Sequence, residues 1–335
     1  MPAGTLNKDI TTKKEDYSDL LHVVDQKNTP FCTSLKTGPK ARNSTFDWTV
    51  DKYDDPDGLE GHVDGKDVDE YEDAHGDRAK LRNNVQEFRR TAKVSVQTQE
   101  GTDMPGAKDP LKRAVAKKLV EIKRDKEATY LGDGDAADDD GLTGSKTCRL
   151  GTWISTAGPT LFSVPEAYRP AAAQVVSTAT ASLDEDTDLQ GILTAVFDAV
   201  GLANGSYKLL CGSTLRRRFT TMTTKREHGT DSKAALTQRN FNSGMSERKV
   251  TSTISVFEGD FGEIIVEPSS FIGWSSGAPD KDRGYLLDMD KICERPMVNT
   301  RVEKLSNNGG GERRLIRNIA GLEVGNPIGL GKFIP

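Results

Sequence analysis

Two segments of alternating polarity, residues 45–51 and 91–97, flank a long stretch with few apolar side chains. Their apolar members are Phe46, Trp48 and Val50 in the first segment and Ala92, Val94 and Val96 in the second. Alternation with a period of two predicts half-buried strands. A loop this long is uncommon inside a compact domain and is usually functional or bound to a partner. The sequence therefore predicts two strands that carry a long polar loop between them.

This loop is electrically divided. Residues 51–77 hold twelve acidic side chains and two lysines, whereas residues 78–93 hold six basic side chains and one acid, Glu87. In a self-associating protein the acidic stretch of one copy could meet a basic surface of the next. A solvated loop whose charges maintain solubility would have the same composition. Charge alone leaves both interpretations open.

Residues 109–131 carry the strongest helical pattern. Asp109 is a suitable N-cap, and Pro110 stands at the first helical position, where its missing N–H costs nothing. One apolar stripe follows at helical spacing, formed by Leu111, Val115, Leu119 and Ile122. We expect this stripe to pack the helix against the rest of the chain.

The remaining segments mix helices and strands. A short helix is expected at Asp16–Asp25, stopped by Pro30, and a second amphipathic helix from about Thr187 to Gly201. The buried face of the second helix is expected to hold Leu189, Ile192, Leu193, Val196, Phe197 and Val200. Residues 151–181 are expected to be irregular, and residues 216–218 are expected to form a basic helical turn. Strands are expected at 207–211, in a hairpin around Gly259–Asp260, at 284–290 and at 313–324. The fold class is therefore α+β.

Composition bounds the function. Apolar residues make up 35% of the chain, so much polar surface or long arms are expected. No run is long and apolar enough to span a membrane, and the start has no apolar core of a secretory signal. The cysteines, Cys32, Cys148, Cys211 and Cys293, are too far apart to suggest a disulfide or zinc framework and are expected to be reduced. The net charge of -5 argues against general affinity for nucleic acid.

Candidate sites for chemistry are weak. The acidic loop from Asp133 fits an EF-hand at its first and third positions and then fails at Ala137 and Asp138. The glycines of residues 325–331 enclose five residues where a phosphate loop needs four, and Phe333 stands in place of its Ser or Thr.

The histidines, His22, His62, His75 and His228, adjoin no nucleophile or metalloprotease pattern. Basic residues 216–218, with Lys225 and Arg226, lack the aromatic residues of a nucleic-acid site. We predict no catalytic, cofactor-binding or metal-binding residues. A soluble hydrolase or a metal-binding enzyme that uses His62, His75 or the acids of 133–140 remains the alternative from another class.

Six segments in order resemble one family of proteins. They are DYSDLLHVVDQKNTPFCTSL, TFDWTVDKYDDPDGLEGH, RNNVQEFRRTAKVSVQTQ, PLKRAVAKKLVEIKRDKEATYLGDG, YLLDMDKICERPM and RRLIRNIAGLEVGNP. The set resembles the HK97-fold major capsid proteins of tailed double-stranded DNA bacteriophages, in particular the SU10-like family. Residues 140–250 are similar by position only.

The resemblance implies an HK97-like fold with named parts. It implies an N-terminal arm at 1–42 and an extended loop at 43–100. A peripheral domain would comprise 101–150 and 295–335, with a spine helix at 109–131, and an axial domain would comprise 151–294. Some members of this fold are cross-linked through Lys and Asn; Lys52, Lys66 and Lys80 lie in the loop, but no cross-link is predicted.

The function implied is that of a non-enzymatic major capsid protein that self-assembles into pentamers and hexamers of an icosahedral head enclosing double-stranded DNA. Expected partners are other copies, scaffolding, portal and decoration proteins, and packaged DNA bound without sequence specificity. Assembly in the host cytoplasm and a final place in the virion are expected. An encapsulin-like nanocompartment shell is the alternative within the same fold.

The expected mechanism is assembly. Phe46, Trp48 and Val94 are expected to hold the loop strands together, and the loop is expected to lie on an adjacent subunit. We therefore expect Trp48→Ala to impair assembly more than folding.

Overall fold

A computed structural model describes most of the chain. The described residues are 28–53, 64–65, 67, 78–101, 109–201, 206–224, 226–227, 235–236, 240–244, 247–251, 256–259, 261–275, 277–307 and 309–334. The expected helix at Asp16–Asp25, most of the acidic stretch, Lys66, Lys225 and the histidines lie outside these residues. Within the described part, no helix is both long and apolar enough to cross a membrane.

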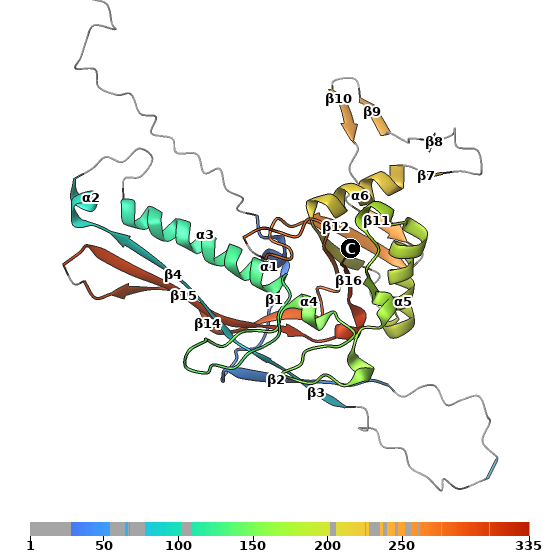
Figure 1. Cartoon of the computed structure of the whole chain (residues 1–335), viewed down its shortest axis with the longest axis horizontal. Helices are drawn as coiled ribbons and strands as arrows, with labels where there is room; N and C mark the ends of the chain where they lie inside the picture. Colours follow the sequence, from blue (N-terminus) through green and yellow to red (C-terminus); the bar gives the residue numbers. More distant parts are fainter. Residues whose placement is uncertain are drawn as a thin grey trace, which may run out of the picture.

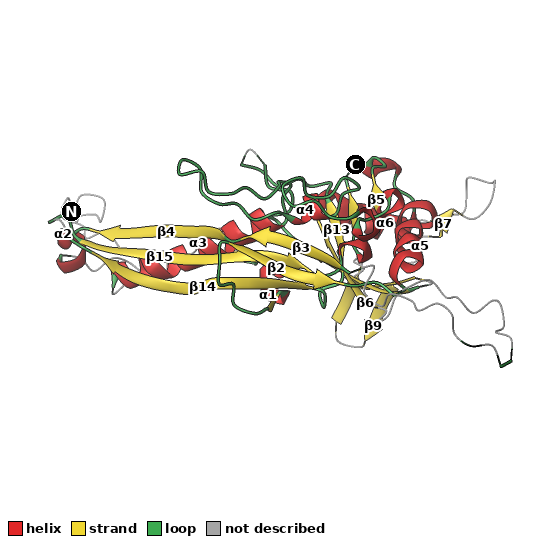
Figure 2. Ribbon diagram, turned by 90° about the horizontal axis from the view of Figure 1, so that it is seen from below, coloured by secondary structure: helices red, strands yellow, loops and turns green. Residues whose placement is uncertain are grey.

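One half of the molecule is a long, narrow sheet with a helix along one face (Figures 1 and 2). The strand order is β1-β14-β15-β4, and β14 and β15 form its long central hairpin. The bounds are β1 Lys36–Thr37, β14 Ile292–Leu305, β15 Glu312–Val324 and β4 Gln86–Val94. The helix is α3, Pro110–Tyr130, whose 21 residues make it about 32 Å long.

Helix α3 confirms the helix predicted at 109–131. The side chain of Asp109 accepts hydrogen bonds from the backbone N–H groups of Leu111 and Lys112, both at 3.1 Å. Leu111 and Ile122 are buried; Ile122 belongs to the larger apolar core, and Val115 and Leu119 are half-buried against that core. The predicted stripe therefore does pack the helix onto the body.

The pairing predicted for the loop strands is wrong. Strand β2, Thr45–Val50, pairs with β3, Ala79–Asn84, and Trp48 lies opposite Leu81. The returning segment that contains Val94 instead forms β4, which pairs with β15. Val96 leaves the sheet altogether, because Ser95 caps the short helix α2, Val96–Glu100. Both predicted strands exist, but a third segment between them supplies the partner of the first.

The other half contains a six-stranded sheet with the order β11-β12-β6-β13-β16-β5. The bounds are β11 Val256–Gly259, β12 Gly262–Pro268, β6 Ser206–Cys211, β13 Gly284–Leu287, β16 Gly331–Phe333 and β5 Val175–Val176. Helices α5, Gln190–Val200, and α6, Ser213–Thr224, cover one face of this sheet (Figure 1). The strands predicted at 207–211 and 313–324 are confirmed, the strand predicted at 284–290 ends at Leu287, and β11 and β12 form the hairpin predicted around 259–260. The residue pattern alone did not predict the long strand β14.

The second amphipathic helix is confirmed with a correction. Helix α5 ends at Gly201, whose φ of 65° lies in the region that favours glycine. Leu189, Ile192, Leu193 and Val196 are buried as predicted, but Phe197 is 43% exposed and Val200 40% exposed. The helical period therefore predicted a wider buried face than the one that packs on the sheet.

Short elements complete the described chain. The helices are α1 Pro30–Ser34 and α4 Leu150–Trp153, with short 3-10 or π turns at Glu166–Tyr168, Ala172–Gln174, Thr180–Ser182, Glu185–Leu189 and Pro327–Gly329. Two small hairpins join β7, Arg226–Glu227, to β8, Ala235–Leu236, and β9, Asn240–Gly244, to β10, Glu247–Thr251.

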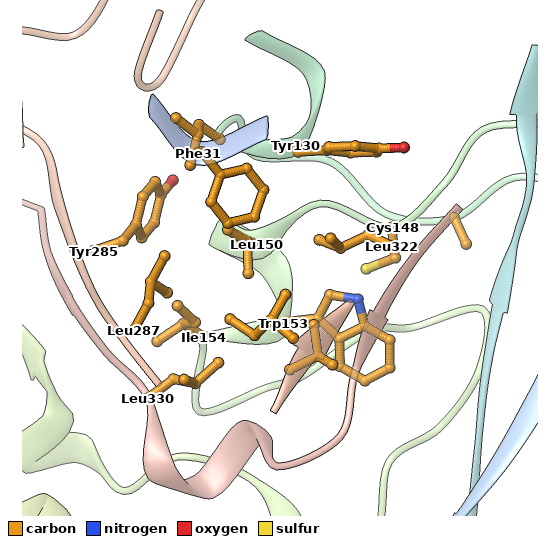
Figure 3. Close-up of a cluster of buried hydrophobic side chains, with 14 of the residues drawn as sticks. Phe31, Tyr130, Cys148, Leu150, Trp153, Ile154, Tyr285, Leu287, Leu322 and Leu330 are labelled. Carbon is orange, nitrogen blue, oxygen red and sulfur yellow. The ribbon is translucent and has the colours of Figure 1, made fainter. Parts of the chain in front are cut away.

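The larger apolar core lies where the two halves meet (Figure 3). Phe31 of α1 packs edge-on against Tyr130 at the end of α3, with ring centroids 6.3 Å apart. Around them gather side chains from α4, β13 and β15, among them Leu150, Trp153, Tyr285, Leu287 and Leu322. The two halves therefore share one core rather than meeting through a linker.

Candidate assembly surfaces

A buried carboxylate fixes the N-terminal helix α1 to α3. Glu127 is fully buried, and its Oε1 and Oε2 accept hydrogen bonds from the backbone N–H groups of Phe31 at 3.0 Å and Cys32 at 2.7 Å. The hydroxyl of Ser269, after β12, donates to Oε1 at 3.1 Å. Burial raises the pKa of Glu127, although the bonds from Cys32, Phe31 and Ser269 act to lower it. One side chain thus caps α1 from another helix and joins three segments.

Next to it, α3 is tied to the long sheet. Lys126 forms an ion pair with Glu294 of β14, and the hydroxyl of Tyr130 donates to Glu294 at 3.0 Å. These groups are largely buried, so the pair is shielded from salt. The angle between helix and sheet is therefore set by directional contacts as well as by apolar packing.

A second polar junction links the two halves. Arg283, before β13, forms an ion pair with Asp133, which follows α3, and its Nε lies 3.2 Å from Asp280. The buried Nζ of Lys332 donates to the carbonyl of Gly151 at 2.7 Å. A Cβ on Gly151 would lie 1.8 Å from Asp133, so only glycine leaves room for this junction. Burial lowers the pKa of Lys332.

The base of the β2–β3 hairpin is part of the core. The ring of Trp48 stacks on that of Phe46, with centroids 5.7 Å apart, and its centroid lies 5.6 Å from that of Trp153. The indole N–H of Trp48 donates to the carbonyl of Val324 at 3.1 Å. Asn83 is fully buried and donates to Leu322 O at 2.6 Å. The loop therefore starts from a fixed base.

The face of the long sheet opposite α3 is rich in cations. Phe88 and Arg90 point toward α3, where Phe88 meets Tyr130 and Arg90 binds Asp125. Alternate residues of β4, β15 and β14 therefore point to the other face. The register aligns Arg301, Arg317 and Arg89 in one row, and Arg313 and Lys93 in a second row. We call Arg89, Lys93, Arg301, Arg313 and Arg317 the cationic sheet face.

Few acids balance this face. Glu87 lies 2.9 Å from Arg317, and Glu303 lies 2.6 Å from Arg301. Among the described residues no ion pair is recorded for Arg89, Lys93 or Arg313. Like charges directly opposite each other destabilise a sheet, so this arrangement favours an anionic partner.

The acids of the loop after α3 act as structural acceptors. Asp135 accepts hydrogen bonds from the backbone N–H and side chain of Thr160 and from the backbone N–H groups of Ala136 and Leu161. Burial alone would raise its pKa, but these bonds lower it. Asp138 accepts from Asn84 at 2.8 Å. Within the described part of the chain, no group of His, Cys, Asp and Glu could hold a metal ion.

The other candidate motifs form no site either. Residues 325–333 form a turn and the sheet strand β16 rather than a phosphate loop, and Arg218 of α6 donates to the carbonyl of Leu183. A hollow of about 800 Å³ opens between α2, α3 and the far end of β14, where Val96, Val115 and Val302 line it. Charged residues of its lining are already engaged in the fold: Asp109 caps α3, and Glu312 binds Arg314.

Sequence reasoning missed Glu127, Arg283 and Asn83. Each carries a polar side chain in a polar-looking segment, and only the approach of a distant segment buries it. Their sequence neighbours give no signal that would have identified them.

The sequence matches the family model described as SU10 major capsid protein over residues 3–334. No curated protein matches the sequence.

Several solved structures share the fold. The capsid of the native GTA particle aligns with a TM-score of 0.61 at 10% identity, covering 98% of this chain and 96% of that one. A structure of Mycobacterium phage Adephagia aligns with a TM-score of 0.61 at 13% identity, covering 99% and 98%. The holo-SrpI encapsulin complex from Synechococcus elongatus PCC 7942 aligns with a TM-score of 0.53 at 12% identity, covering 94% and 91%.

Proposed function

This chain belongs to the SU10 major capsid protein family, and we propose that its copies assemble into pentamers and hexamers that close into an icosahedral bacteriophage head around double-stranded DNA. The observation that carries the proposal is the family match over residues 3–334, together with a fold shared with phage capsids. The family is structural, so the protein is a major capsid protein and not an enzyme.

We propose that the subunit has the parts that the resemblance implies. Residues 1–42 act as an N-terminal arm, and 43–100 as an extended loop whose returning strand β4 is hydrogen-bonded into the long sheet. Residues 101–150 and 295–335 form a peripheral domain around α3. Residues 151–294 form an axial domain around the six-stranded sheet, to which the peripheral segment 295–335 contributes β16.

The acidic loop of one subunit lies on the cationic sheet face of its neighbour. The loop supplies a large excess of carboxylates over residues 51–77, and the cationic sheet face carries arginines and lysines that few acids of its own subunit balance. Opposite potentials on the two surfaces would steer encounter and exclude wrong registers. Unlike a solvated loop, such a contact explains why both charges are concentrated.

Electron microscopy and sedimentation of the protein expressed alone test the proposal. Closed shells, or flat pentamers and hexamers, are the expected result. A chain that remains monomeric or dimeric at every concentration, alone and with the scaffolding protein of its phage, would refute it.

A double charge reversal tests the contact of the loop. Lys93→Glu with Arg313→Glu is expected to abolish or strongly slow assembly and to leave the thermal unfolding of the free subunit nearly unchanged. The matched control reverses two exposed lysines on α3, Lys117 and Lys123. Equal loss in both double variants would show that net charge matters and that the proposed contact is wrong.

Scaffolding, portal and decoration proteins are proposed partners, and DNA is proposed to be packaged without sequence specificity. Assembly would occur in the host cytoplasm before the protein becomes part of the virion. The likeness to an encapsulin supports a second candidate, a nanocompartment shell. Nucleic-acid absorbance of particles purified from infected or expressing cells distinguishes them, because a nanocompartment would hold protein cargo and no DNA.

A further inference from the structure

The six-stranded sheet has one covered side and one partly open side. Ile264 and Val266 of β12 are buried beneath α5 and α6. Ile265, between them, points to the opposite face, where it is 43% exposed. The register places it directly opposite Val256 of the edge strand β11, which is 39% exposed. Together with the exposed Glu263, which shares their face, these residues form what we call the open side.

The inner part of this face is covered by the subunit itself. Lys208 of β6 binds Glu267 and donates to Ser34 at the end of α1, at 2.5 Å for both contacts. Beyond β6, in the described residues, β12 and β11 continue without a covering helix. The open side is therefore the end of the face that α1 does not reach.

The opposite side of the sheet also exposes apolar residues. Phe197 and Val200 project from α5, and Phe197 stacks on Phe261 with centroids 4.7 Å apart. On α6, Leu215 and Phe219 face the sheet, so Arg217 lies on the outward face, where it is exposed. We call Phe197, Val200 and Arg217 the helix side.

The two sides are complementary in chemistry. Each presents a pair of exposed apolar residues, and one adds an arginine where the other adds a glutamate. No ion pair is recorded for Arg217 or Glu263 among the described residues. Exposed apolar residues and an unpaired charge on the same side of a sheet are typical of a surface that a partner covers.

We propose that the helix side of one copy packs on the open side of the next copy within a pentamer or hexamer, with Arg217 beside Glu263 of the neighbour. This inference rests on the proposed function. In a ring of identical subunits every contact is head-to-tail, so two different sides of the same chain must match each other. The second copy is the occupant because the chain carries both halves of the match on opposite faces of one sheet.

Charge exchange tests the pairing. Arg217→Glu and Glu263→Arg are each expected to raise the protein concentration needed for assembly about tenfold, because each places like charges in contact. The double variant with both reversals restores the pair and is expected to assemble within about twofold of the wild type. Glu166→Arg, a reversal at an exposed residue elsewhere in the axial domain, is the control for net charge. Thermal unfolding of free subunits checks that all variants fold.

Each outcome decides the matter. Recovery in the double variant alone supports the pairing. Single variants that assemble like the wild type, or a double variant that stays impaired while the wild type assembles, would overturn it and leave the capsid function intact. A wild-type chain that forms no assemblies under any condition would overturn the proposed function, and this inference with it.

Discussion

The Glu127→Gln substitution tests whether one buried carboxylate holds α1 on the subunit. The two carboxylate oxygens accept separate backbone N–H groups, those of Phe31 and Cys32. Glutamine offers one oxygen and one NH2 group. In either orientation of the amide, one of the two buried N–H groups faces another donor. An unsatisfied buried donor costs about 1 to 3 kcal/mol, and we expect a loss of that size in the free energy of unfolding.

The loss should depend on pH in a defined direction. Burial raises the pKa of Glu127, so the folded subunit retains a proton over a range in which the unfolded chain, with a pKa of about 4.3, has released it. Stability from this group therefore falls as the pH rises through that range. Glutamine has no proton to release. The destabilisation by Glu127→Gln should be largest near about pH 4 and smaller near about pH 7.

Chemical denaturation of unassembled subunits measures both effects. Glu127→Ala removes both acceptors and should cost about 3 to 5 kcal/mol. Glu121→Gln is the control on the same helix, since Glu121 binds Lys118 near the surface, and it should cost less than about 1 kcal/mol. The reasoning fails if Glu127→Gln costs no more than the control, or if its cost grows as the pH rises.

Three further predictions concern the core and the second junction. Trp48→Ala should cost the free subunit about 3 to 5 kcal/mol in denaturation, which revises the expectation that assembly suffers first; an unchanged unfolding midpoint would contradict the burial of this residue. Gly151→Ala should lower the melting temperature, because its Cβ would collide with Asp133, whereas Gly144→Ala, which meets nothing within 4 Å, should not; equal melting of both would count against this junction. Burial raises the pKa of Cys211 to about 12, so its thiol should resist alkylation until the subunit unfolds, as mass spectrometry of labelled peptides can show; rapid labelling of native protein would contradict this.

Local patterns in the sequence correctly predicted those elements that interactions between nearby residues stabilise. The cap at Asp109, the proline after it and the apolar stripe define α3 because helix ends and faces depend on residues within a few positions. The alternation of Phe46 and Trp48 likewise defines β2. Strand partners depend on segments far apart in the chain, so the pairing of β4 with β15 could not be read from either strand.

Strand β14 shows a second limit. It contains Pro296 and a run of charged residues, which argue against a strand when only composition is considered. The register shifts near Pro296 where β14 pairs with β15, so the sheet accommodates the proline at an irregularity. The hairpin is stabilised by its partner strand and not by its own propensity.

The polar junctions suggest how the subunit keeps one shape. Apolar burial is not directional, so the shared core alone would not fix the angle between the two halves. Hydrogen bonds and ion pairs have narrow geometry, and the contacts at Glu127 and between Asp133 and Arg283 join segments that the core only brings near. In a closed shell, a small error in this angle would be repeated at every contact. Loosening either junction should therefore broaden the size distribution of assembled shells before it prevents subunits from folding.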